Sequence, residues 1–141
     1  MKIGFTGSRF GMTPQQKEVI TRLEIFTTKV SEAHHGDCLG SDADFHHFIR
    51  EIDQAIRTII HPGFPANHLD DTTLRAFCEG DHTSPPKSFL ARNRDIVDET
   101  DMLIATPATK KEMGGTWYTI IYSRKQKKHR VIVYPDGSIG E

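Results

Sequence analysis

The stretch Asp101-Met-Leu-Ile-Ala-Thr-Pro107, followed by Met113-Gly-Gly-Thr-Trp117, decides how the rest of the chain is interpreted. Its apolar part, Met102-Leu-Ile-Ala105, is too short for a helix and predicts a buried parallel strand. Gly114, Gly115 and Thr116 then precede apolar residues at helical spacing, which predicts a helix start. The free N–H groups of a helix's first turn attract anions, and glycine lets a ligand approach the backbone. This stretch therefore predicts an anion site; the alternative is a βα turn relieved by glycine.

The composition is typical of one globular domain covering residues 1–141, a length that can bury one core. The net charge of -1 provides no long-range attraction to nucleic acid or to an anionic membrane. No apolar run approaches membrane-spanning length, and Arg9 interrupts any signal-peptide core. We therefore expect a cytoplasmic protein with no membrane partner, in which Cys38 and Cys78 are reduced thiols.

The first predicted strand, Lys2 to Thr6, runs directly into Gly7, Ser8 and Arg9. Glycine permits a tight turn, serine offers a hydroxyl group, and arginine offers a bidentate fork for phosphate or carboxylate. The pattern is not GxGxxG, so it does not predict a dinucleotide fingerprint. The tripeptide predicts an anion contact or, alternatively, a surface turn.

A helix is predicted to begin at Thr13, with Pro14 in its first turn and Gln16 closing a capping box. Apolar residues then recur at helical spacing: Val19, Leu23, Phe26 and Val30. They are expected to face the core and not a ligand.

A second glycine-bearing turn follows a short polar strand at Ala33-His34-His35. It combines glycine with acidic and hydroxyl side chains: Gly36, Asp37, Gly40, Ser41 and Asp42. A helix is predicted over residues 41–54. Asp37 and Asp42 are expected to accept hydrogen bonds from ligand hydroxyl groups or to cap this helix.

Potential metal ligands gather around the same turn: His34, His35, Asp37, Cys38, Asp42, Asp44, His46 and His47. Adjacent histidines in a strand point to opposite faces of the sheet. Neither HExxH nor paired CxxC spacing occurs. The sequence therefore predicts neither a bound metal nor a cofactor.

Arg57-Thr-Ile-Ile60 predicts a third strand, and the following residues 66–87 show no clear periodicity. A connection of that length predicts a functional loop or a mobile one. A helix is predicted over residues 88–100, with Arg92 and Asn93 near its start. These two side chains suit a phosphate and a base or sugar edge, the alternative being a solvated helix face.

Strands and helices alternate along the chain up to a last strand at Val131-Ile-Val-Tyr134. This alternation predicts an α/β, three-layer Rossmann-like domain with a mainly parallel sheet of about five strands. Ligands of such sheets bind at the carboxyl ends of the strands. Three turns, at residues 7–9, 36–42 and 106–116, would share that edge. They are expected to form one cradle for a negatively charged small molecule.

The motifs taken together resemble the SLOG superfamily, and within it the small YspA-like group. The resemblance covers nearly the whole chain and rests on the order of its motifs: Gly7-Ser-Arg9, His35-Gly-Asp37, Gly40-Ser-Asp42, Arg92-Asn93 and Gly114-Gly-Thr-Trp117. It implies a Rossmann-like fold and a nucleotide or nucleotide-derived ligand. SLOG relatives include LOG-type phosphoribohydrolases, DprA-type DNA-binding proteins and sensor domains of bacterial and phage conflict systems.

The resemblance also implies roles for individual residues. Gly114-Gly-Thr116 matches the end of the LOG-type Pro-Gly-Gly-x-Gly-Thr loop, which binds phosphate, and Arg92 matches the basic residue of the preceding helix. LOG-type enzymes carry acidic residues directly after Gly-Thr, where this chain has Trp117-Tyr-Thr119. The departure leaves phosphate binding intact and puts the phosphoribohydrolase reaction in doubt.

Two functions are therefore expected. The first is a binding module for a nucleotide-derived small molecule. The second is an N-glycosidase acting on nucleoside monophosphates, with Asp37, Asp42 or Glu112 replacing the missing acid. A nucleic-acid partner is disfavoured by the neutral charge and the absence of interleaved aromatic and basic residues. The apolar content of the last helix would permit a homo-oligomer.

Overall fold

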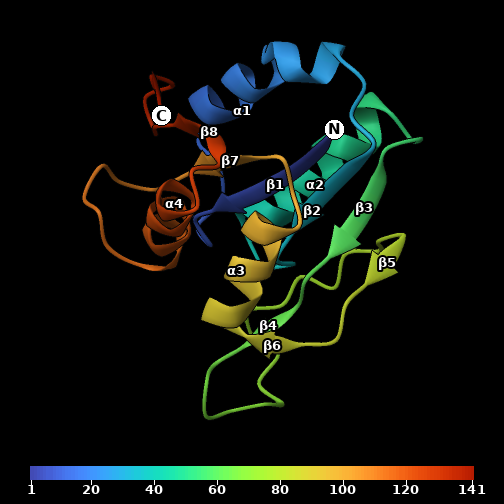
Figure 1. Cartoon of the computed structure of the whole chain (residues 1–141), viewed down its shortest axis with the longest axis vertical. Coiled ribbons are helices and arrows are strands. Elements are labelled where there is room, and N and C mark those ends of the chain that lie inside the picture. The colour runs from blue at the N-terminus through green and yellow to red at the C-terminus, as the bar shows by residue number, and fades with distance from the viewer.

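The computed structural model describes residues 1–141, which fold around a seven-stranded sheet in the order β5-β3-β2-β1-β7-β8-β9 (Figure 1). Its five longer strands are parallel: β1 (Lys2–Gly7), β2 (Glu32–His35), β3 (Arg57–Ile60), β7 (Met102–Thr106) and β8 (His129–Val133). Short strands extend both edges, β5 (His82–Thr83) in parallel and β9 (Ile139–Gly140) in antiparallel orientation. The α/β prediction with a mainly parallel sheet is confirmed, and the two edge strands are additions to it.

The alternation of side chains along β1 explains the layers on either side of the sheet. Phe5 points to one face, where its ring stacks on Phe45 of α2 (Ser41–Ile52) with centroids 4.3 Å apart. Gly4 points to the other face, where a Cβ would lie 2.8 Å from Thr100 Oγ1. The first face carries α1 (Pro14–Thr21) and α2, and the second carries α3 (Phe89–Asp98) and α4 (Gly115–Lys125) (Figure 1). The three layers are those expected.

The first helix is shorter than its apolar pattern indicates. The capping box forms as predicted, since Thr13 Oγ1 accepts from Gln16 N and Gln16 Oε1 accepts from Thr13 N. The helix ends at Thr21 because Leu23 is extended, and a 3-10 turn, η1 (Glu24–Thr27), follows. The four apolar residues predicted to face the core nevertheless pack against it. No helix has the length and apolarity needed to cross a bilayer.

The long connection after β3 is irregular but attached to the rest of the domain. It contains β5 and a separate two-stranded pair, β4 (Gly63–Phe64) with β6 (Lys87–Ser88). Leu39 N donates to Leu74 O at 2.8 Å, and Cys38 forms an isolated bridge with Arg75. The segment therefore runs beside the turn that follows β2.

Candidate functional site

A cleft of about 410 Å³ opens at the carboxyl ends of β1 and β7. The chain builds the sheet outward from β1 to β3 and then returns to the other side of β1, so the strand order switches between β1 and β7. This switch point is where ligands bind in open α/β sheets. All three glycine turns and α3 contribute to the walls: Gly7, Ser8, Arg9, Phe10, Gly36, Cys38, Asp42, Arg92, Asn93, Pro107, Ala108, Thr109, Met113, Gly114, Gly115, Thr116 and Trp117.

The first turn of α4 presents backbone N–H groups that have no partner in the protein. Tyr118 N makes the first bond of the helix, to Gly114 O at 2.9 Å, whereas the N–H groups of Gly115, Thr116 and Trp117 donate to no acceptor. Gly114 has a φ of 92°, which favours glycine, and the space where a Cβ of Gly114 or Gly115 would stand is open. The positive end of the helix dipole therefore faces free volume in the cleft.

The first two glycine-bearing turns, at residues 7–9 and 36–42, are packed closely against each other beneath the cleft. A Cβ on Gly7 would collide with Thr106 Oγ1, and one on Gly40, which has a φ of 88°, would collide with the carbonyl oxygen of Arg9. Ser41 N donates to Ser8 O at 2.9 Å. Gly40 and Ser41, predicted to contact the ligand, do not line the cavity, because they are used in holding the turn after β1.

Arg9 and Asn93 bring uncommitted donors to the cleft. Arg9 is exposed and takes part in none of the ion pairs of the chain; its guanidinium lies 5.9 Å from the ring centroid of Phe10. Asn93 Oδ1 accepts from Arg92 Nε at 2.7 Å, and the amide nitrogen of Asn93 has no acceptor in the protein. One positive charge and one amide donor are thus free to contact a ligand.

Arg92 lines the cleft as well, but its donors are largely committed. Its Nη1 donates to the carbonyl oxygens of Gly36 and His61, and its Nη2 lies 3.5 Å from Cys38 Sγ. A Cβ on Gly36 or on Gly63 would collide with or crowd this guanidinium, so the two glycines form the slot that holds it. Arg92 therefore contributes mainly positive charge to the cleft, because most of its hydrogen-bond donors are already bonded within the protein.

Asp42 is the one predicted acid that reaches the cleft. Its side chain is buried, and its Oδ2 accepts from Cys38 N at 3.0 Å. Burial raises the pKa of Asp42 to about 6, against the opposing effect of the Arg92 charge. A carboxyl group of this pKa can exchange a proton near neutral pH.

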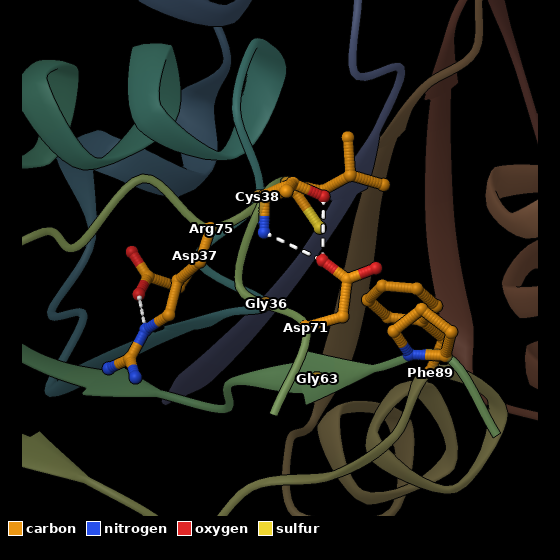
Figure 2. A pocket seen from close by; sticks show the side chains of 10 residues that line it. Gly36, Asp37, Cys38, Gly63, Asp71, Arg75 and Phe89 are labelled. Atoms are coloured by element: carbon orange, nitrogen blue, oxygen red, sulfur yellow. Dashed lines mark hydrogen bonds and ion pairs between the residues drawn. The ribbon is translucent and has the colours of Figure 1, made fainter. Parts of the chain in front are cut away.

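The other two acids are placed elsewhere. Asp37 is fully buried; it pairs with Arg75 Nε at 2.8 Å and accepts from Cys78 N at 2.8 Å. It lines a separate cavity of about 10 Å³, on one side of which Figure 2 shows the Asp37–Arg75 pair. Glu112 is exposed outside the cleft and pairs with Arg124 at 2.8 Å. The catalytic roles predicted for Asp37 and Glu112 do not fit these positions.

The cleft is also lined by apolar side chains that the sequence did not predict as site residues. Phe10 and Met113 line it with 85% and 65% of their surface exposed, so neither is a core residue. Leu74, from the long connection, and Phe89, at the start of α3, line it too. A large apolar residue directly after Gly7-Ser-Arg9 was the available signal, because no strand or helix pattern accounts for Phe10.

Two clusters that contain potential metal ligands lie on opposite faces of the sheet. One consists of His35, His46 and Cys78, and the other of His34, His61 and Glu99. The two adjacent histidines of β2 thus point to opposite faces, as the strand geometry predicts. Both cysteines are free thiols. Burial is the main cause of the raised pKa of each thiol, and it raises the pKa of Cys78 to about 12.

The site thus combines a helix N-terminus, one free guanidinium, one free amide and one titratable carboxyl group around a single cavity. These features come from residues far apart in the sequence and from both faces of the sheet. Comparison with protein-family models, with curated proteins and with solved structures found no match for this chain.

Proposed function

We propose that this chain is a binding module that holds a nucleotide or a nucleotide-derived ligand in the cleft, with its phosphate on the first turn of α4. One observation carries the proposal: three unbonded N–H groups of that turn share a cavity with the unpaired guanidinium of Arg9. A phosphate has several acceptor oxygens and negative charge, which suit helix N-terminal N–H groups and a guanidinium fork.

The rest of the cleft suits the rest of a nucleotide. The Asn93 amide can donate to a base or sugar oxygen, and the Asp42 carboxyl can accept from a ribose hydroxyl group. Phe10 and Met113 offer exposed apolar surface on which a base can stack. A volume of about 410 Å³ lies within the range of small-molecule sites. The resemblance of the motifs to SLOG domains points to the same class of ligand.

Calorimetric titration with inorganic phosphate, AMP, cyclic AMP, ADP-ribose and adenosine tests the proposal. Phosphate-bearing probes are expected to bind, and adenosine to bind more weakly. Arg9→Gln should weaken the phosphate-bearing probes by about 1.5–3 kcal/mol, as for a lost charged hydrogen bond. Arg22→Gln is the matched control, because Arg22 is exposed on α1 and pairs with Glu18. Absence of binding for every probe, or equal affinities in the Arg9 variant, would contradict the proposal.

Cleavage of an N-glycosidic bond in a nucleoside monophosphate is the second candidate, favoured by the position and pKa of Asp42 alone. An ionised carboxylate near the sugar can stabilise the oxocarbenium-like centre, or it can act as a base that activates a water molecule. Incubation with AMP should then release adenine, and Asp42→Asn should abolish the release while AMP still binds. Release unaffected by Asp42→Asn would remove this role from Asp42.

A further inference from the structure

Three buried side chains at the floor of the cleft have unused hydrogen-bonding capacity. Thr6 and Asn93 are each 8% exposed and Asp42 is 5% exposed, and all three line the cavity. The hydroxyl group of Thr6 and the amide nitrogen of Asn93 have no hydrogen-bond partner in the protein, yet neither atom is sealed from solvent. Both atoms are therefore available to a ligand in the cleft.

The packing of α3 on β1 places the Asn93 amide near the Thr6 hydroxyl group. Gly4 and Thr6 alternate with their neighbours along β1 and so point to the face that carries α3. A Cβ on Gly4 would lie 3.0 Å from Ile96 Cγ2. Because α3 leads into β7, it runs away from the carboxyl edge of the sheet, so Asn93 is one turn closer to that edge than Ile96. Thr6 is likewise two residues closer to it than Gly4.

The hydrogen bonds within the protein determine what each of the three groups can offer. Asn93 Oδ1 accepts from Arg92 Nε at 2.7 Å, so the free end of the amide only donates. Asp42 Oδ2 accepts from Cys38 N at 3.0 Å, and the carboxylate has lone pairs for further donors. The Thr6 hydroxyl group can donate and accept. A ligand group at this floor must therefore both donate and accept, and it must carry no negative charge, which Asp42 would repel.

The exposed apolar side chains of the cleft, Phe10 and Met113, lie at its mouth. Neither side chain carries a strong hydrogen-bond donor or acceptor that could read the edge of a base. Stacking on apolar surface tolerates every base, because every base has a π-face. The mouth of the cleft therefore suits a base without selecting one.

We infer that the cleft selects its ligand at the sugar and not at the base: Thr6, Asn93 and Asp42 bind the 2′,3′-diol of a ribose 5′-phosphate unit. This inference rests on the proposed function, because the phosphate on α4 holds the ribose that is attached to it. Two vicinal hydroxyl groups donate and accept, and so match an amide donor, a carboxylate and a hydroxyl group. The base, on the far side of the ribose from the phosphate, then stacks at the mouth. A deoxy sugar would leave a buried polar group of the floor without its partner, which lowers affinity.

Calorimetry with AMP, GMP, UMP, 2′-deoxy-AMP and 3′-deoxy-AMP tests the inference. It is done at about pH 8, above the pKa of Asp42, which burial raises to about 6. The three ribonucleotides should bind within about fivefold of one another. At least one deoxy analogue should bind about tenfold or more weakly than AMP, as for a lost hydrogen bond to a charged group.

Thr6→Val removes the hydroxyl group and keeps the shape of the side chain. It should weaken AMP about 2–10-fold and reduce the preference for AMP over at least one deoxy analogue. Asn93→Asp keeps the acceptor for Arg92 and removes the donor; the ratio of AMP to deoxy affinities is its readout, because both ligands carry the same phosphate. Thr28→Val is the matched control, since Thr28 is exposed outside the cleft. Circular dichroism checks that each variant is folded.

Equal affinities for AMP and both deoxy analogues would overturn the inference. So would a preference among the three bases that exceeds the preference for ribose, or a ratio unchanged in both the Thr6 and the Asn93 variants. If AMP still binds and Arg9→Gln weakens it, the proposed function survives that result, so the two failures are distinct. Absence of binding for every phosphate-bearing probe would overturn both.

Discussion

The guanidinium of Arg92 joins the carboxyl ends of two neighbouring strands, because it donates to the carbonyl oxygens of Gly36 after β2 and His61 after β3. The side chain of Arg92 is 5% exposed. Truncation of Arg92 would therefore leave buried carbonyl groups without donors. A residue predicted as a ligand contact is thus also a structural support of the cleft floor.

Arg92→Met should lower the free energy of unfolding by about 2–5 kcal/mol, because the apolar stem remains while the buried acceptors lose their partners. Arg92→Lys should restore only part of the loss, since one ammonium group cannot reach acceptors that the planar fork joins. Urea denaturation measures both variants. A loss below about 1 kcal/mol in the methionine variant would show that the slot does not stabilise the fold.

Asp42 should give the chain a measurable pH dependence. Its pKa is raised from 3.8 to about 6, so the folded chain holds this proton more tightly than the unfolded chain does. Its contribution to the free energy of unfolding therefore falls as pH rises from about 4 to about 6 and is level above that. His61, with a pKa lowered to about 4, has the opposite effect in an overlapping range, because its contribution falls as pH falls.

Comparison of Asp42→Asn with the unmodified chain isolates the first effect, because His61 is common to both. The stability of the variant relative to the unmodified chain should increase by roughly 2–3 kcal/mol between about pH 4 and about pH 7. Urea denaturation at several pH values across this range gives the difference. A difference independent of pH would show that Asp42 has an ordinary pKa in the folded chain.

The first turn of α4 allows a single N–H group to be removed without breaking the helix. Gly115 is the first helical residue, its N–H is unbonded, and nothing lies where its Cβ would stand. Proline is well tolerated at that position. Gly115→Pro should therefore keep the helix and weaken phosphate-bearing ligands about tenfold or more, as for one lost charged hydrogen bond.

Gly115→Ala is the matched control, because it adds a Cβ at the same place and keeps the N–H group. Calorimetry with AMP measures both affinities, and thermal unfolding measures both stabilities. Similar affinities for the alanine and proline variants would mean that this N–H group does not contact the ligand.

The elements that the sequence predicts are those with a strong local pattern. The position of strand β7 is predicted to within a few residues by the apolar run Met102–Ala105. The start of helix α1 is predicted equally well by the capping box of Thr13 and Gln16. The strands β4, β5, β6 and β9 are two residues long, and their pairing depends on neighbours distant in sequence. Such pairing leaves no period in the chain, which is why it was not predicted.

The side-chain partners at the site were predictable only in part, for the same reason. Glycine turns after strands indicate the shared edge, because parallel strands end together. That Gly36 makes room for Arg92, or that Asp37 is paired with Arg75, depends on where a third segment lies. The sequence analysis compared His34 only with its neighbours in the chain. Its hydrogen-bond partner in the structure is His61, which follows another strand.

At the scale of the whole molecule, the order β3-β2-β1-β7-β8 brings the turn after β1 next to the loop that leads into α4. Arg9 and Gly115 are distant in sequence, yet both line the same cavity. The charge of the whole chain is near zero, so attraction of an anion depends on this local arrangement. Affinity for phosphate-bearing probes should accordingly fall with added salt much less steeply than for a polybasic nucleic-acid binder.

The most direct test of this arrangement is a titration of ¹⁵N-labelled protein with AMP, with inorganic phosphate as a second probe, followed through its backbone amide resonances. The N–H groups of Gly115, Thr116 and Trp117 should show the largest shifts, and Gly115→Ala should preserve those of the other two. If both probes leave these three amides unmoved, or if the largest shifts fall on residues outside the cleft, the first turn of α4 is not where the phosphate binds.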